Sequence, residues 1–255
     1  MSQSNFDLSG RFALINGASR GIGEAIALRL AEAGAHVICT SRKLEGCQAV
    51  ADKIIKAGGS AEAMVCHAGE LSSIEQTMDA ITKTHGKLHI LVNNGATNPF
   101  YGSVSETPEW AYDKTMEVNV KGPFFLSAKA IPLMRAAGFG SIINIASINA
   151  IQPGQLQGVY SITKAALVSM TKSFAKEYAP ENIRCNAVLP GFTDTKMTAV
   201  FKQDEKLLDK LLKGNVPMNR MAQPTEMAGA VLYLAADSSS YTTGTEIVID
   251  GGYLL

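Results

Sequence analysis

The chain has 255 residues, of which 46% are hydrophobic and 18% charged, and its 23 Lys and Arg residues balance 23 Asp and Glu residues. This length suits one large α/β domain or two small ones, and the composition is ordinary for a globular enzyme with a sizeable core. A net charge near zero, without a basic run, argues against nucleic acid or an anionic membrane as the main partner.

The two ends of the sequence and the cysteines indicate the cell compartment in which the protein is expected. The first eleven residues show no basic segment followed by an apolar stretch, no apolar run approaches the roughly 20 residues that span a bilayer, and the last residues carry no S-K-L-like tripeptide. Cys39, Cys47, Cys66 and Cys185 lack paired spacing, which favours reduced thiols over disulfides or a metal site. We therefore expect a cytoplasmic protein without a membrane partner and without a metal.

Short apolar runs alternate with longer helical patterns along most of the chain. The predicted strands cover residues 12–16, 36–40, 62–66, 88–92, 141–146, 183–189 and 246–250. The predicted helices cover residues 22–33, 43–57, 73–85, 107–136, 158–179 and 225–236. Several strands are apolar nearly throughout, as is typical of strands covered on both faces. The alternation predicts an α/β fold in which a doubly wound parallel sheet carries helices on both faces and binds ligands at the C-terminal strand ends.

Local signals mark several helix ends. Gly34, Gly58 and Gly86 follow predicted helices, where a left-handed cap favours glycine. Pro108 stands where a helix can begin, with Thr107 before it as the expected N-cap. No linker or repeat interrupts the chain, so residues 1–255 are expected to form one dinucleotide-binding and catalytic domain.

The first strand runs into the sequence N-G-A-S-R-G-I-G, from Asn16 to Gly23, and then into a helix. Gly17, Gly21 and Gly23 let the backbone turn tightly and approach a ligand. Free N–H groups at the helix start favour a pyrophosphate. The spacing is G-x-x-x-G-x-G rather than G-x-G-x-x-G, and its position between a strand and a helix indicates nucleotide binding.

The end of the second strand bears on the choice of cofactor. An acidic residue there would accept hydrogen bonds from the adenosine 2′-hydroxyl of NAD. Ser41 and Arg42 occupy this place instead, and Arg20 projects from the glycine-rich loop. Two guanidinium groups suit a 2′-phosphate, so NADP(H) is the expected cofactor, with NAD(H) as the alternative.

Tyr160 and Lys164 lie four residues apart in Y-S-I-T-K, thirteen residues after Ser147 at the end of an apolar run. Residues i and i+4 share a helix face. An ammonium beside a phenol is expected to lower the phenol pKa from about 10 toward neutral pH. A serine at the end of a neighbouring strand can bind the same substrate oxygen, so the three residues are typical of a proton-transfer site.

Residues 192–216 interrupt the alternation with a polar, lysine-rich helical stretch between a Pro-Gly corner and Pro217. A segment inserted after a sheet strand can act as a substrate lid. An ordinary amphipathic surface helix is the alternative, and the sequence leaves both interpretations open.

Taken together, these motifs resemble the short-chain dehydrogenase/reductase family over nearly the whole chain, with the nearest similarity to NADPH-dependent carbonyl reductases and 3-oxoacyl-carrier-protein reductases. The resemblance implies a single-domain Rossmann-type sheet of about seven strands and a catalytic tetrad. The motifs that carry it are the glycine-rich loop, N-N-G-A at 93–96, Asn119, Ser147, Tyr160 with Lys164, Pro190-Gly191, P-T-E-M-A at 224–228 and residues 241–252.

The tetrad roles follow from the resemblance. Tyr160 is expected to exchange a proton with the substrate oxygen, Lys164 to lower its pKa and bind the nicotinamide ribose, Ser147 to hydrogen-bond the substrate oxygen, and Asn119 to fix a water. The resemblance also implies a set of cofactor contacts. They are Gly17, Ser19, Arg20, Gly21, Ile22, Gly23, Ser41, Arg42, Asn93, Gly95, Tyr160, Lys164, Pro190, Gly191 and Thr193.

Three residues depart from the family pattern. Asn16 replaces a threonine, and N-N-G-A exchanges the last two residues of N-N-A-G, so the backbone at Gly95 is expected to pack differently. His67 stands where an aspartate usually meets the adenine amine. A neutral imidazole can accept one hydrogen bond there, or His67 is a polar residue without a ligand role.

The expected activity is reduction of a ketone or aldehyde, such as a 3-oxoacyl substrate, to an alcohol. Oxidation of an alcohol or sugar is the alternative, and a dinucleotide-sensing module without catalysis is a more remote one. The residues expected to line the substrate pocket are Ser147, Asn149, Gln155, Gln157, Phe192 and Phe201. The resemblance also implies a homotetramer formed through the helices at 107–136 and 158–179 and the C-terminus.

Overall fold

The structure is a computed structural model, which describes residues 5–198 and 205–255. Its sheet contains seven parallel strands in the order β3-β2-β1-β4-β5-β6-β7. The strands are β1 (Phe12–Asn16), β2 (His36–Ser41), β3 (Ser60–Val65), β4 (Ile90–Asn93), β5 (Gly140–Ile145), β6 (Ile183–Pro190) and β7 (Glu246–Ile249). The predicted doubly wound α/β fold is confirmed, and strand positions agree with the prediction to within two residues.

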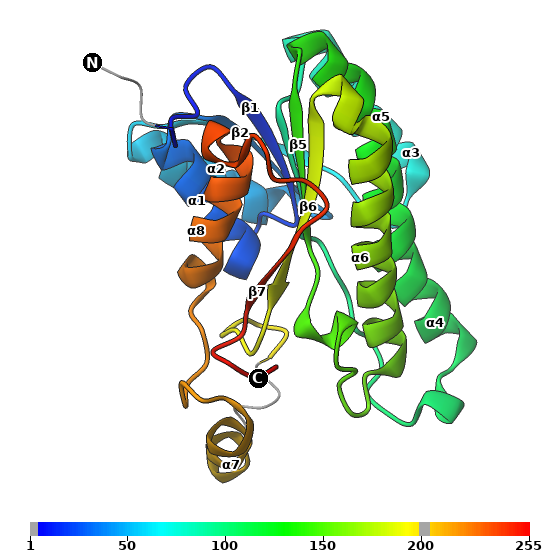
Figure 1. Ribbon diagram of the computed structural model, residues 1–255. Coiled ribbons are helices and arrows are strands. Elements are labelled where there is room, and N and C mark those ends of the chain that lie inside the picture. The colour runs from blue at the N-terminus through cyan, green and yellow to red at the C-terminus, as the bar shows by residue number, and fades with distance from the viewer. Residues whose placement is uncertain (1–4, 199–204) are drawn as a thin grey trace.

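Helices cover both faces of the sheet (Figure 1). One face carries α1 (Gly21–Glu32), α2 (Leu44–Lys56) and α8 (Pro224–Ala235), and the other carries α3 (Leu71–His85), α4 (Glu109–Met116), α5 (Gly122–Ala137) and α6 (Gly158–Tyr178). A further helix, α7 (Glu205–Asn215), lies beyond the C-terminal ends of the strands. The described part of the chain holds no helix long and apolar enough to cross a bilayer.

The sheet divides the core into two apolar layers. Along β1, Ala13 and Ile15 pack against the α1, α2 and α8 side, while Leu14 packs against the α3, α5 and α6 side. All three are fully buried, because a strand covered on both faces alternates its side chains between two cores. The four cysteines are buried and free, as the sequence predicted.

The predicted glycine caps are confirmed, since Gly34, Gly58 and Gly86 all have positive φ angles of 98°, 87° and 66°. The expected N-cap at Thr107 is wrong. Thr107 ends a short 3₁₀ turn (Val104–Glu106), and Pro108 occupies the N-cap position of α4.

The single helix predicted at 107–136 is also wrong, because a π-helical segment, Glu117–Lys121, separates α4 from α5. Pro123 lies in the first turn of α5 and has no N–H to donate to the carbonyl of Asn119, four residues earlier. The helix therefore widens at this point, and Asn119 lies within the widened segment.

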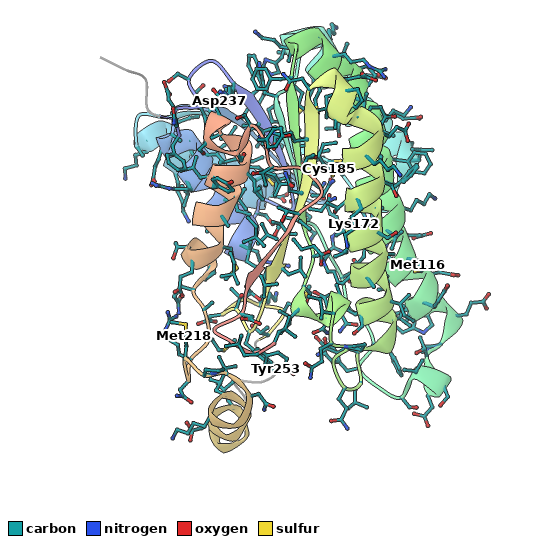
Figure 2. All side chains as sticks on the ribbon, in the orientation of Figure 1. Met116, Lys172, Cys185, Met218, Asp237 and Tyr253 are labelled. Carbon is teal, nitrogen blue, oxygen red and sulfur yellow. The ribbon has the colours of Figure 1, made fainter. Side chains whose placement is uncertain are left out.

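The segment at 192–216 contains loop residues after β6 and the helix α7. Leu212, Val216 and Met221 form a small buried cluster, to which Phe192 and Tyr253 contribute. Figure 2 shows Tyr253 and Met218 at the same end of the molecule as α7. The segment thus packs against the C-terminal residues, next to the ends of β6 and β7.

Candidate active site

A cavity of about 840 Å³ opens at the C-terminal ends of the strands. This volume lies within the range of small-molecule and cofactor sites. Thirteen of the residues predicted to contact a dinucleotide line it. They are Gly17, Ser19, Arg20, Gly21, Ile22, Ser41, Arg42, Gly95, Tyr160, Lys164, Pro190, Gly191 and Thr193. Ser147 lines the same cavity.

Tyr160 and Lys164 face the cavity from the first turns of α6. Lys164 is 3% exposed, and its Nζ donates a hydrogen bond of 2.8 Å to the carbonyl of Ile145 at the end of β5. The same Nζ lies 5.5 Å from the centroid of the Tyr160 ring. The lysine therefore bridges the helix and the strand while it stays close to the phenol.

Burial sets the protonation of both groups. It raises the pKa of Tyr160 to about 12, an effect that a hydrogen bond with Ser147 offsets only in part. Burial also lowers the pKa of Lys164 to about 7. The expectation that the Tyr160 pKa falls toward neutral pH is therefore wrong for the protein without a ligand, because burial of the phenol dominates its pKa. At neutral pH the phenol keeps its proton.

Ser147 caps the short 3₁₀ turn Ile148–Ala150 that follows β5. Its Oγ accepts a hydrogen bond of 3.1 Å from the backbone N–H of Asn149. A hydroxyl that accepts from the backbone keeps its own hydrogen for donation toward the cavity. Ser147 and Tyr160 thus present two hydroxyl groups to the same region.

Asn119 does not line the cavity. Its Oδ1 accepts from the backbone N–H of Thr97 at 2.8 Å, and its Nδ2 donates to the carbonyl of Thr97 and to Thr163 Oγ1. The side chain therefore joins the π-helical segment to the loop after β4 and to α6. Its amide is occupied in this way, and its predicted role in fixing a water stays a prediction.

The glycine-rich loop is tightly packed against Gly95 and against the start of α1. A Cβ on Gly17, which has a φ of 84°, would lie 2.7 Å from the backbone nitrogen of Gly95, and a Cβ on Gly23 would lie 2.1 Å from the carbonyl oxygen of Gly17. Helix α1 begins after Arg20 without a side-chain cap. The N–H groups of its first turn are therefore available to an anion in the cavity.

Two departures from the family pattern meet in the structure. A Cβ on Gly95 would lie 2.4 Å from Asn16 Oδ1, so a residue larger than glycine at position 95 conflicts with asparagine at position 16. The altered order N-N-G-A thus accommodates the altered residue at the end of β1.

Gly23 and Asn93 were predicted to contact a cofactor, but they do not line the cavity. Gly23 lies beneath Gly17 and permits the close approach of the loop to α1. Asn93 is 3% exposed, and its Nδ2 donates to Ser127 Oγ and Asn144 Oδ1. Asn94 is the lining residue instead, and its Nδ2 donates to the carbonyl of Gly17 at 2.8 Å.

Three cationic side chains reach one end of the cavity. Arg20 and Arg42 are exposed and line it, as does Lys43, which the sequence prediction did not include. Ser41 Oγ donates to the carbonyl of Lys43 at 2.8 Å and fixes this turn after β2. Glu45 also lines this part of the cavity, so three cations and one carboxylate give it a net positive charge.

His67 lines the cavity, but its acceptor nitrogen is occupied. Nδ1 accepts a hydrogen bond of 3.1 Å from the backbone N–H of Gly69. In the neutral ring the proton then lies on Nε2. The expected acceptor role is therefore wrong, and His67 offers the cavity a donor.

The predicted substrate pocket is only partly assembled. Of its six residues Ser147 lines the cavity, Asn149 donates to Gln157 at 3.0 Å, Gln155 is exposed and Phe192 packs against Tyr253. Phe201 lies outside the described residues. The sequence prediction missed several lining residues, which lie in loops, in α4 or in the π-helical segment. They include Tyr101, Lys114, Val118, Thr195, Lys196, Met197 and Thr198.

These residues fit a phosphorylated dinucleotide. The glycine-rich backbone and the uncapped start of α1 suit a pyrophosphate. The cationic end around Arg20 and Arg42 suits a further phosphate. The other end holds the Ser147, Tyr160 and Lys164 side chains, which can transfer a proton.

Comparison with known proteins gives consistent results. Residues 17–254 match the model of a family described as Enoyl-(Acyl carrier protein) reductase. The chain is 36% identical over 245 residues to human Dehydrogenase/reductase SDR family member 4, covering 96% of this chain and 88% of that protein.

Two solved structures show the same fold and carry NADP. A 3-oxoacyl (acyl-carrier-protein) reductase from Agrobacterium tumefaciens with NADP bound has a TM-score of 0.94 and 33% identity, covering 99% of this chain and 98% of that one. A gluconate 5-dehydrogenase from Burkholderia cenocepacia in complex with NADP and tartrate has a TM-score of 0.94 and 29% identity, covering 100% and 99%.

Proposed function

The chain belongs to the short-chain dehydrogenase/reductase family of NAD(P)-dependent oxidoreductases, and we propose that it uses NADPH to reduce a ketone or aldehyde to an alcohol. The observation that carries this proposal is that one cavity brings the Tyr160 and Ser147 hydroxyl groups together with the glycine-rich loop and Arg42, and burial of Tyr160 keeps its phenol protonated. A group that keeps its proton at neutral pH can give that proton to a carbonyl oxygen as the carbon is reduced.

The cofactor, when bound, supplies the hydride that the carbonyl carbon receives. The first turn of α1 and Gly17 would hold its pyrophosphate, and Arg20 and Arg42 would hold its 2′-phosphate. Lys164 hydrogen-bonds the nicotinamide ribose in this proposal. These residues would hold the cofactor in the same cavity as Tyr160.

Tyr160 and Ser147 act on the substrate oxygen. The Tyr160 hydroxyl donates its proton to the oxygen, while the Ser147 hydroxyl donates a hydrogen bond that stabilises the developing negative charge. Lys164, with a pKa near 7, can exchange a proton with water at neutral pH and so return one toward the phenolate. Asn119 positions α6 through Thr163 and offers its main-chain carbonyl to a water of this relay.

The cofactor preference can be tested with Arg42. We expect kcat/KM to be higher with NADPH than with NADH, and Arg42→Ala to reduce this preference about ten- to a hundredfold, since a hydrogen bond to a charged group contributes about 1.5–3 kcal/mol. Arg29→Ala is the matched control, because Arg29 is an exposed α1 arginine paired with Glu32 at 3.2 Å. A parent enzyme that prefers NADH contradicts the NADP(H) assignment.

The similar proteins include enzymes named for reduction and for oxidation. One NADP-bound neighbour is a 3-oxoacyl reductase, and another is a gluconate 5-dehydrogenase. We favour reduction because Arg20 and Arg42 in the cavity favour NADP(H), and NADP preference tilts the balance toward reduction; oxidation of a sugar or alcohol is the second candidate. An NADPH-oxidation screen with keto esters, diketones, quinones, aldehydes and an acetoacetyl thioester tests the first. Turnover only with polyols and NADP⁺ favours the second, and NADPH binding without any turnover favours a sensing module.

We further propose that residues 1–255 act as one domain, that residues 192–216 cover bound substrate, and that the enzyme is a cytoplasmic homotetramer. Thr195 and Met197 line the cavity, which supports the lid.

Trp110, Tyr112 and Phe124 are 61%, 45% and 45% exposed on α4 and α5, which supports burial of this surface between copies. Four free buried thiols suit a reducing compartment. A monomeric mass by light scattering, or a periplasmic cell fraction, contradicts these assignments.

A further inference from the structure

Three of the four histidines of the chain lie near the N-terminal ends of the strands, opposite to the end that holds the cavity. His36 begins β2, His85 ends α3, and His89 precedes β4. All three rings pack around Phe12 at the start of β1, with ring centroids 4.5–5.9 Å from that of Phe12. No part of the proposed reductase site uses this group.

The sheet register brings a carboxylate to two of these histidines. His36 pairs with Ser60 at the start of β3, and Glu62 follows two residues later on the same face of the strand. Helix α3 covers this face and places His85 in its last turn, just before the Gly86 cap. Residues far apart in the sequence therefore converge on one point.

Within the described residues, His36, Glu62 and His85 offer ligand atoms that all lie within 4.8 Å of one another. Glu62 Oε1 lies 3.3 Å from His36 Nε2 and 2.5 Å from His85 Nε2. The side chains are 25%, 30% and 11% exposed, so the cluster is partly buried but open to water on one side.

The surroundings of the cluster orient its ligand atoms. His36 Nδ1 lies 2.7 Å from Ser60 Oγ, which can accept its proton and leave Nε2 free as a ligand. A hydrogen bond from the second ring nitrogen is the usual way in which proteins orient a metal-binding histidine. The Phe12 ring packs against both imidazoles and restricts their rotation.

We propose that His36, Glu62 and His85 form a binding site for one Zn²⁺ ion, with water as the fourth ligand. Two imidazole nitrogens and one carboxylate oxygen are a zinc donor set, whereas Mg²⁺ and Ca²⁺ select oxygen ligands. A tetrahedral ion with bonds of about 2.0–2.1 Å separates its ligand atoms by about 3.3 Å. The Glu62–His36 pair has this spacing, and the Glu62–His85 pair must open by about 0.8 Å.

Such an ion would join β2, β3 and the end of α3 without touching the cofactor cavity. The proposal does not depend on the proposed reductase activity, because its site and its readout are separate. A Zn²⁺ ion held only by the folded chain also raises the melting temperature.

The experiment is a calorimetric titration of the untagged full-length chain with ZnCl₂. We expect one Zn²⁺ per chain, a melting temperature that rises with zinc, and no displacement by excess Mg²⁺. His36→Gln, His85→Gln and Glu62→Gln each lower the zinc affinity at least a hundredfold, and Ser60→Ala lowers it about tenfold. Absence of zinc binding to the parent chain overturns the proposal. The cluster would then be a group of hydrogen-bonded side chains without a metal.

Two variants are matched controls for the affinity measurement. Glu75→Gln changes another carboxylate on α3, one that pairs with Lys129 at 2.9 Å, and leaves the zinc affinity unchanged. His67→Gln removes the histidine at the opposite end of the sheet and also leaves it unchanged. Unaltered affinity in the His36 and His85 variants overturns the proposal.

Cobalt substitution covers the case in which a ligand variant does not fold. The parent chain with Co²⁺ is expected to show visible bands of a tetrahedral ion with nitrogen and oxygen ligands. A strong near-ultraviolet thiolate-to-cobalt band would place the metal at a cysteine instead and overturn the proposal.

Discussion

Lys164 carries the largest electrostatic cost in the described part of the active site. Its side chain is buried, and burial lowers its pKa from an ordinary 10.5 to about 7. Below pH 7 the lysine is protonated in both the folded and the unfolded chain, so the full cost of burying the ammonium opposes folding. Between pH 7 and 10.5 the unfolded chain holds the proton more often, and stability therefore rises with pH.

Lys164→Met should therefore stabilise the protein while it removes activity. Each unit of pKa difference corresponds to about 1.4 kcal/mol. After the lost hydrogen bond to Ile145 is allowed for, we expect the free energy of unfolding to rise by about 2 kcal/mol at pH 6. The gain should shrink as the pH approaches 10. Denaturant titrations at both pH values measure it.

Lys172→Met is the control, because Lys172 lies on the same helix (Figure 2). Its side chain is 59% exposed and pairs with Glu246. It should not reproduce the gain at pH 6. A Lys164→Met variant that is less stable than the parent at pH 6 would show that the buried ammonium is well compensated.

The proximity of Tyr160, Lys164 and Ser147 was predictable from sequence, because helical spacing and a strand end fix their neighbourhood. Their protonation was not. The pKa values of Tyr160 and Lys164 depend on how deeply α6 and β5 bury them, and burial is a property of the assembled fold.

At the scale of elements, the loop after β1 and the loop after β4 are fitted to each other. Gly95 lies against Asn16 so closely that a methyl group has no room, and Asn94 ties the second loop to Gly17. Gly95 does not have a positive φ, so its backbone accepts alanine and only the contact with Asn16 opposes one.

A double-mutant cycle tests this fit. Gly95→Ala should lower the free energy of unfolding by about 1–3 kcal/mol, as overpacking does. In the background of Asn16→Thr, which shortens the opposing side chain, the same change should cost less than about 1 kcal/mol, so the two positions are coupled. Chemical denaturation at pH 7 gives the four values.

Gly229→Ala serves as the control for a glycine change without a clash, because nothing lies within 4 Å of its added Cβ. Additive effects of Asn16→Thr and Gly95→Ala would contradict the coupling and leave the exchanged order N-N-G-A without a packing reason.

Element positions were largely predictable, and the main failure has an identifiable cause. Hydrophobic periodicity locates helices, but it does not show where a proline lacks the N–H that a regular helix needs. Pro123 was the available signal for the break between α4 and α5, and the break fixes the place of Asn119.

At the scale of the whole molecule, the parallel sheet separates two groups of polar residues. The cavity lies at the C-terminal ends of the strands, and the cluster of His36, Glu62 and His85 lies near their N-terminal ends. The first group was predictable, because the C-terminal ends of parallel strands meet on one side of a fold in which strands and helices alternate. The second was not, because its members come from three elements with no shared motif and meet only through the register of β2 and β3 and the return of α3.

The most direct test of the account is NADPH binding and NADPH oxidation measured together for the parent and for Tyr160→Phe, with a substrate found in the screen. The phenol is the proposed proton donor, so we expect the Phe variant to lose about 10²- to 10⁴-fold in kcat while its Kd for NADPH stays within about twofold. Tyr241→Phe, a change at a fully exposed tyrosine, should match the parent. Full turnover by Tyr160→Phe would contradict the assignment of the proton donor and with it the proposed reductase site.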